Sequence, residues 1–362
     1  MKDEIYQRLC EEMAKRGGLY PGMDIPEFYD LARELFTPEE AAVAASLPPK
    51  PKTAKEMASE LGRDESEMRK ILEAMADKGL CRSFEKDGNR YYAGSPFVPG
   101  IFEFQFMRGT STERDRRIAR AIRAYKQAVD KARGPLKIAF PPNRVIPISE
   151  TIRPDSKIHT YDQVSSYIDR HDPIAVSTCF CRHEAKLLDE KDDCGMPNDV
   201  CMQFGLAANF VIERGLGRKV TKEEARNTLK RAAEAGLVHA GVNTQELNFL
   251  CNCCSCHCMI LKTALSQPKP GRVLFSGFQP RIDPDICTGC QICVDRCPAK
   301  AAILIQDVPE MDADRCFGCG VCAIGCPAGA IQMIEKPGLP EPPLDFKGLR
   351  QAMEPDVERR NG

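Results

Sequence analysis

The feature that most constrains this chain is a cysteine pattern near its C-terminus that occurs twice. The first copy is C-x2-C-x2-C-x3-C-P, formed by Cys287, Cys290, Cys293, Cys297 and Pro298. The second copy has the same spacing and is formed by Cys316, Cys319, Cys322, Cys326 and Pro327. Thiols at this spacing can wrap one compact metal group, because the curled backbone then points N–H groups at the sulfurs. The repeat therefore predicts two similar thiolate-rich sites.

These runs resemble the bacterial two-cluster ferredoxins over residues 278–336, and they match at every ligand position. The resemblance implies two [4Fe–4S] clusters that carry single electrons at low potential. It also implies that the fourth cysteine of each run serves the other cluster. Cluster 1 would take Cys287, Cys290, Cys293 and Cys326, and cluster 2 would take Cys316, Cys319, Cys322 and Cys297. Zinc is the alternative metal, but structural zinc sites use different pair spacings.

A second group of cysteines lies between residues 179 and 258, and its spacings fit no ferredoxin run. Its members are Cys179, Cys181, Cys194, Cys201, Cys251, Cys253, Cys254, Cys256 and Cys258. Thiols so crowded are prone to oxidation without a metal. The segment resembles a cysteine-rich region of multi-cluster iron–sulfur proteins of anaerobes. It therefore predicts one or two further [4Fe–4S] clusters, with zinc as the main alternative.

The ligand pairing within this second group is open. We expect one cluster on Cys179, Cys181, Cys194 and Cys201 and another on the 251–258 run, although the groups could mix across the fold. Cys201 is expected near the start of a helix over residues 200–214, where the helix dipole favours a thiolate. His257 stands among the cysteines and could either bind the metal or donate a hydrogen bond to a cluster sulfur.

The N-terminal part shows helical patterns with only two isolated cysteines, Cys10 and Cys81. Residues 1–50 carry apolar residues at helical spacing. Two short capped helices and a hairpin at Asp87-Gly88 follow, an order that resembles a winged-helix domain of bacterial regulators. A helix that reads DNA presents basic or polar residues, whereas residues 64–67 read Asp-Glu-Ser-Glu. DNA is therefore the less favoured partner, although residues 114–123 are rich in arginine.

Together these patterns predict an α+β, multidomain chain. It would combine a helical and winged-helix N-terminal part, a cysteine-rich α/β middle domain and a C-terminal ferredoxin-like two-cluster domain. The expected divisions are residues 1–50 (helical), 51–95 (winged-helix-like), 96–160 (basic helix and proline-rich connector), 161–275 (cysteine-rich metal domain), 276–336 (ferredoxin domain) and 337–362 (irregular tail).

Composition narrows the functional classes. The formal net charge of −1 gives no overall field that would attract nucleic acid or a membrane surface. No apolar run is long enough to span a bilayer, and the charged start shows no signal peptide. We therefore expect a reducing, anaerobic cytoplasm, in which metal ligation is favoured over a disulfide scaffold.

The expected function is electron transfer. No G-x-G-x-x-G or P-loop pattern occurs, so a partner oxidoreductase or flavoprotein is expected to perform the chemistry while this chain relays single low-potential electrons. The first alternative is an iron–sulfur redox-sensing transcriptional regulator that uses the winged-helix segment. The second alternative is an enzyme with an atypical cluster at residues 251–258.

Overall fold

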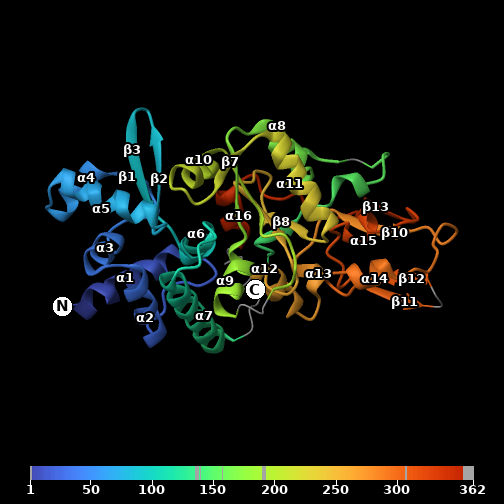
Figure 1. Cartoon of the computed structure of the whole chain (residues 1–362), viewed down its shortest axis with the longest axis horizontal. Coiled ribbons are helices and arrows are strands. Elements are labelled where there is room, and N and C mark those ends of the chain that lie inside the picture. Colours follow the sequence, from blue (N-terminus) through green and yellow to red (C-terminus); the bar gives the residue numbers. More distant parts are fainter. Residues whose placement is uncertain are drawn as a thin grey trace, which may run out of the picture. The chain divides into compact units, whose positions relative to one another are not determined.

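The computed structural model describes residues 2–134, 138, 140–156, 158–189, 193–305 and 308–353. Its helices and strands are mixed along the chain (Figure 1), as the predicted α+β class requires. Unit 1 comprises residues 1–136, 177–193 and 209–218, and unit 2 comprises residues 137–176, 194–208 and 219–362. Among the described residues, no helix is both long enough and apolar enough to cross a membrane.

Unit 1 begins with the helices expected in residues 1–50. They are α1 (Lys2–Arg16), α2 (Pro26–Leu35) and α3 (Pro38–Ala44). Leu9, Met13 and Phe28, which belong to the apolar pattern, are completely buried. The helical spacing therefore identified the face that forms the core.

The helix–helix–hairpin segment is also present. Its elements are β1 (Lys52–Thr53), α4 (Ala54–Leu61), α5 (Glu65–Asp77), β2 (Cys81–Lys86) and β3 (Asn89–Gly94), with sheet order β1-β3-β2. Thr53 caps α4 with a capping box, and the Asp64 side chain accepts from the N–H of Glu67 at the start of α5. Asp87 and Gly88 both have positive φ, which suits a tight hairpin turn.

The remaining elements of unit 1 are helical. They are the kinked segment η1 (Phe97–Ile101), α6 (Phe102–Phe106), the arginine-rich α7 (Glu113–Arg133) and α9 (Phe180–Leu188). Lys126 of α7 donates to the Glu184 carboxylate of α9, with Nζ 2.8 Å from Oε2. The isolated Cys10 and Cys81 are buried, as expected for small core residues.

Unit 2 is built around a six-stranded sheet with order β4-β8-β9-β6-β5-β7. The strands are β4 (Asn143–Val145), β5 (Ile174–Thr178), β6 (Asp199–Phe204), β7 (Arg218–Val220), β8 (Val238–Val242) and β9 (Phe249–Cys253). The helical segments nearby in sequence are η2 (Ser149–Thr151), η3 (Thr160–Asp162), α8 (Val164–Arg170), α10 (Gly205–Glu213), α11 (Lys222–Glu234), α12 (Met259–Leu265) and α13 (Pro270–Val273). Tyr167, Met202 and Leu250 belong to one buried cluster that joins α8 to β6 and β9.

Three expectations for this part of the chain are wrong. Residues 199–204 form strand β6 instead of the start of a helix, so Cys201 does not lie at a helix N-terminus. Five of the six positions of β6 are buried, and a run buried on both faces has no periodicity that separates strand from helix. The predicted proline-rich connector contains strand β4, and the predicted irregular tail contains helix α16 (Phe346–Met353).

The C-terminal cysteine runs form a small two-fold module within unit 2. Its elements are β10 (Phe278–Ile282), α14 (Ile292–Arg296), β11 (Ala302–Ile305), β12 (Val308–Met311), α15 (Val321–Ile324) and β13 (Ile331–Glu335). They lie together in Figure 1. β10 pairs antiparallel with β13, and β11 pairs antiparallel with β12, so each half supplies one strand to each pair.

The backbone repeats its geometry at equivalent positions of the two halves. The N–H of Cys287 donates to the Asp283 carbonyl at 3.1 Å, and that of Cys316 donates to the Asp312 carbonyl at 2.9 Å. Left-handed backbone also recurs in pairs: Gly289 with Gly318, Gln291 with Gly320, and Lys300 with Gly329. The repeat in sequence is thus a repeat in conformation.

Candidate metal centres

Two cavities lie in the C-terminal module, and each is lined by four cysteines. Cavity 1 has about 330 Å³ of empty space and is lined by Cys287, Cys290, Cys293 and Cys326 among its residues. Cavity 2 has about 320 Å³ and is lined by Cys297, Cys316, Cys319 and Cys322 among its residues. Each cavity therefore draws three cysteines from one run and the fourth from the other run. This grouping is the one that the ferredoxin resemblance implies.

The two short helices explain how the runs cross. Cys293 lies within α14 and lines cavity 1, whereas Cys297 follows the last residue of the same helix and lines cavity 2. In the other half, Cys322 lies within α15 and lines cavity 2, whereas Cys326 lies just beyond that helix and lines cavity 1. Each helix thus presents one thiol to each cavity.

The surroundings of the thiols fit a group that neutralises their charge. Burial raises the pKa of the Cys319 thiol to about 12, while the N–H groups of Val321 and Cys319 act in the opposite direction. The N–H of Ala301 donates to Cys297 Sγ at 3.2 Å. Buried thiolates beside N–H donors need a bound cation for most of their stabilisation, and the irons of a cluster provide it. The residues present therefore fit a thiolate-ligated iron–sulfur cluster in each cavity.

Residues 286–331 match the family model of the 4Fe-4S dicluster domain. The match includes all eight cysteines of the two cavities, and it supports the predicted ferredoxin-like module with 4Fe-4S clusters. An iron–sulfur electron-transfer role is the function that such a dicluster domain indicates. No curated protein and no solved structure shows significant similarity to the chain.

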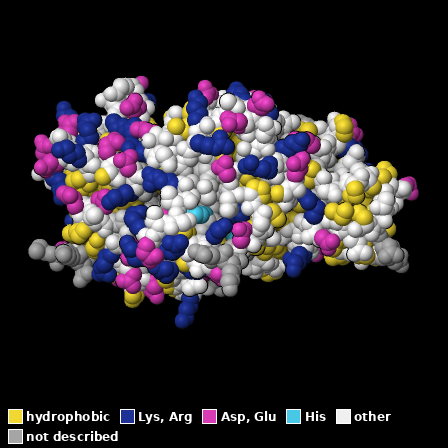
Figure 2. Space-filling model, viewed as in Figure 1, with side chains coloured by type: hydrophobic (Ala, Val, Ile, Leu, Met, Phe, Trp, Pro, Cys, Tyr) yellow, Lys and Arg dark blue, Asp and Glu magenta, His cyan; other side chains and the backbone are white. Residues whose placement is uncertain are grey.

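Exposure differs between the two cavities of the dicluster domain. Of its eight cysteines, Cys290 of cavity 1 is exposed, whereas Cys319 and Cys322 of cavity 2 are buried. The surface nearby carries exposed apolar side chains, which we call the apolar rim: Ile286, Ile292, Ile303, Leu304, Ile305 and Val308. Figure 2 shows hydrophobic side chains on the end of the surface where Figure 1 places the C-terminal module. Cavity 1 therefore has the more exposed ligand thiol, Cys290, although its Cys293 is buried.

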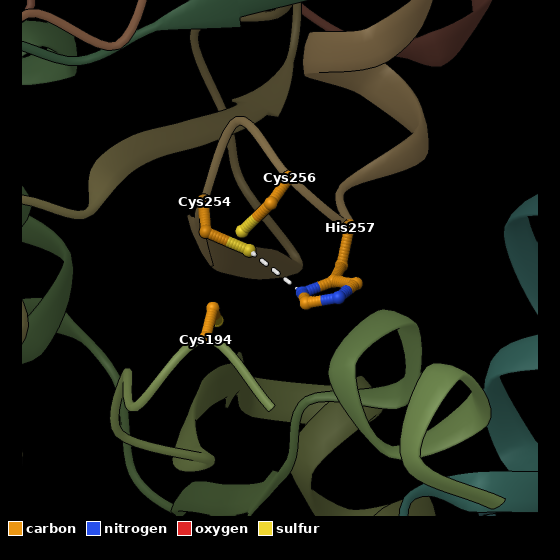
Figure 3. Close-up of side chains that lie close together, drawn as sticks. All are labelled: Cys194, Cys254, Cys256 and His257. Carbon is orange, nitrogen blue, oxygen red and sulfur yellow. Dashed lines mark hydrogen bonds between the residues drawn. The ribbon is translucent and has the colours of Figure 1, made fainter. Parts of the chain in front are cut away.

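Four side chains of the second cysteine group converge on one point (Figure 3). The ligand atoms of Cys194, Cys254, Cys256 and His257 all lie within 4.8 Å of one another. Cys194 comes from the segment before β6, and the other three come from the turn after β9. Cys194 therefore lies with the 251–258 run, an arrangement that corresponds to the mixed grouping left open by the sequence. The set of Cys179, Cys181, Cys194 and Cys201 stays a prediction.

Three other thiols, of Cys251, Cys253 and Cys258, interact with one another in the same segment. Cys258 donates to Cys253, with the two Sγ atoms 3.1 Å apart. Hydrogen bonds with Cys251 and Cys258, together with burial, raise the pKa of the Cys253 thiol well above its ordinary value. Cys253 and Cys258 belong to the same buried cluster as Cys319 of cavity 2. The trio of Cys251, Cys253 and Cys258 thus packs into the core that supports the dicluster domain.

The remaining predicted ligands lie on other elements. Cys201 lies in β6 beside Met202, which pairs with Leu250 in β9, the neighbour of Cys251. Cys179 is the N-cap residue of α9 and Cys181 lies in its first turn, both within unit 1.

Sequence reasoning missed a buried pair that holds β9 in place. His239 of β8 lies with Nδ1 2.5 Å from Asn252 Oδ1, and Asn252 Nδ2 donates to the Val200 carbonyl at 2.5 Å. Burial lowers the pKa of His239 to about 4, so the imidazole is neutral and its Nδ1–H donates to Asn252. Because β9 carries Cys251 and Cys253, this pair positions two thiols. A histidine within an apolar run was the available signal in the sequence.

Proposed function

We propose that this chain is an iron–sulfur electron-transfer protein or subunit, which passes single low-potential electrons to or from a partner oxidoreductase or flavoprotein. The pair of four-cysteine cavities within the dicluster match is the observation that carries the proposal. A [4Fe–4S] cluster supplies one-electron transfer when bound. The protein supplies the thiol ligands, the N–H donors toward their sulfurs and the burial that sets the local polarity.

The difference in exposure suggests where electrons enter or leave. Cys290 offers an exposed thiol ligand at cavity 1, and Ile292 of the apolar rim lines the same cavity. An exposed apolar patch is typical of a surface that meets another protein. We infer that the redox partner approaches cavity 1, with cavity 2 as the inner station.

A third station is supported by the trio of Cys251, Cys253 and Cys258. These residues offer thiols alone, which is the donor set of most [4Fe–4S] clusters. Two of them share a buried cluster with Cys319 of cavity 2. We therefore propose that the trio binds a further metal in a reducing cytoplasm where such thiolates survive. A [4Fe–4S] cluster would extend the relay, but it requires a fourth ligand and a wider spacing than the 3.1 Å between Cys253 and Cys258, and zinc is the alternative.

The regulator alternative has less support. The first turn of α5, the expected reading helix, is acidic through Glu65 and Glu67. Arg90 of the hairpin forms ion pairs with Glu73 and Glu213, so its charge is offset within the protein. Phosphates would meet acidic side chains there. The enzyme alternative also has less support, because Cys253, Cys254 and Cys258 of the 251–258 run are buried and Cys256 is its one exposed cysteine.

The test is anaerobic purification of the full chain, followed by iron and sulfide analysis and EPR of the reduced protein. We expect about eight irons per chain from the dicluster domain, at four irons per cluster, and about four more only where the trio holds a cluster. We also expect reversible one-electron reduction, with turnover of a substrate only after a partner enzyme is added. Colourless, iron-free protein would refute the proposal, and a specific, salt-sensitive DNA complex would favour the regulator instead.

A further inference from the structure

The convergence of Cys194, Cys254, Cys256 and His257 has the dimensions of a site for one ion. Ligand atoms about 2.0–2.3 Å from a tetrahedral zinc ion lie roughly 3.3–3.8 Å from one another. The observed limit of 4.8 Å is about 1 Å above that range, so a small inward movement of the side chains would complete the site. Around a [4Fe–4S] cluster each thiolate binds a different iron, so its thiolates are held apart by the whole cluster. These four side chains instead point at a common centre (Figure 3).

The donor set is also different from that of the dicluster domain. It contains three thiols and one imidazole, with Cys254 Sγ 3.7 Å from His257 Nδ1. Cys3His is a recurring ligand set of structural zinc sites, whereas [4Fe–4S] clusters are typically held by four cysteines. Both the geometry and the chemistry of the donors therefore separate this site from the two cavities.

We propose that Cys194, Cys254, Cys256 and His257 bind a single structural zinc ion. Four protein donors complete a tetrahedral coordination sphere, which leaves no open position for a substrate. The site is independent of the electron-transfer proposal, because it uses none of the cysteines assigned to the relay.

The place of the site in the fold indicates what the ion would stabilise. Cys194 precedes β6 and Cys254 follows β9, and these two strands are neighbours through the pair Met202 and Leu250. Cys254 also packs in a buried cluster with Val200. An ion here would fasten the start of β6 to the end of β9 and close a long loop of the chain. It would thereby hold the turn from which Cys258 reaches the core.

The experiment measures zinc and iron in the full chain, expressed with both metals supplied and purified anaerobically with a weak chelator to remove loosely bound ions. We expect about one zinc per chain in the wild type. Cys256→Ala should lose this zinc, retain the iron and unfold at a lower temperature. Cys256 is exposed, so the substitution leaves the core intact. Cys256→His should retain zinc, because Cys2His2 is also a zinc ligand set. Cys10→Ala, which removes a buried thiol of α1, is the control and should change neither metal.

Three results would overturn the proposal: wild-type protein without zinc, zinc that persists in Cys256→Ala, or loss of about four irons in Cys256→Ala, which would show a cluster at these residues. EPR of the reduced wild type separates this outcome from that of the electron-transfer proposal. Zinc without reducible iron would refute electron transfer alone, and reducible iron without zinc would refute the zinc site alone.

Discussion

Replacing Cys326 by alanine is expected to remove the cluster of cavity 1, although Cys326 belongs to the second cysteine run. The reason is geometric, since Cys326 lines the same cavity as Cys290, whereas Cys319 lines the other cavity. At four irons per cluster the dicluster domain holds about eight irons, so each cavity accounts for about four. Pairs of substitutions can therefore show which cysteines serve one cluster.

Two double variants give opposite outcomes. Cys290→Ala combined with Cys326→Ala removes two ligands from cavity 1 and should leave about four irons in the domain. Each of the two single variants should leave the same number, because either one already removes the cluster of cavity 1. Cys319→Ala combined with Cys326→Ala removes one ligand from each cavity and should leave none. Any iron bound at Cys251, Cys253 and Cys258 adds the same amount to every variant and cancels in the comparison.

The assay is iron analysis together with EPR of the reduced protein, because a cluster that loses one ligand can retain part of its iron. Circular dichroism checks that each variant keeps its secondary structure. If each cysteine run instead supplied all four ligands of its own cluster, the two results would be exchanged. The Cys290/Cys326 double variant would then lose both clusters, and the Cys319/Cys326 double variant would keep one. That exchange would refute the grouping seen in the cavities.

Three further predictions concern particular residues. Gly329 and Gly318 both have positive φ. Gly329→Ala should lower the free energy of unfolding by about 1–2 kcal/mol in a denaturant titration, which is the cost of placing a residue with a side chain in the left-handed conformation. Gly318→Ala should lower it clearly more, because a Cβ there would lie 2.0 Å from the Phe278 carbonyl oxygen. For His239, whose pKa is about 4 against an ordinary 6.5, the unfolded chain takes up a proton first as the pH falls. Stability should therefore drop by up to about 3 kcal/mol between pH 6.5 and 4, and this drop should be missing in His239→Gln. Brief exposure to air should abolish the EPR signal of cavity 1 before that of cavity 2, because its ligand Cys290 is exposed; equal rates of loss would contradict the difference in accessibility.

Local signals in the sequence identified much of this fold because their causes are local. Thr53 and Asp64 start helices through hydrogen bonds to residues three positions away, so a short stretch of sequence contains the whole interaction. The hairpin at Asp87 and Gly88 is equally local. The spacing of the dicluster cysteines is determined in the same way, by a loop that closes around one group.

Signals failed where the determining contact is distant along the chain. Cys194 is grouped with Cys254 and Cys256 by the pairing of β6 with β9, which no spacing in the sequence expresses. β6 itself was taken for a helix because its burial on both faces comes from strands that are remote in sequence. His239 acquires its role only from Asn252 on the neighbouring strand.

The two kinds of donor set suggest why one chain would use two metals. A group that gains and loses an electron benefits from several irons to share the charge and from N–H donors toward the sulfurs, such as that of Ala301 toward Cys297. A group that only fastens two strands needs a fixed charge and a closed shell of donors, which zinc accepts from three thiolates and an imidazole. Because zinc has no redox chemistry, an ion at His257 would hold its turn equally well in the oxidised and the reduced protein. Strand β9, which carries Cys251 and Cys253, would then keep its position while electrons pass.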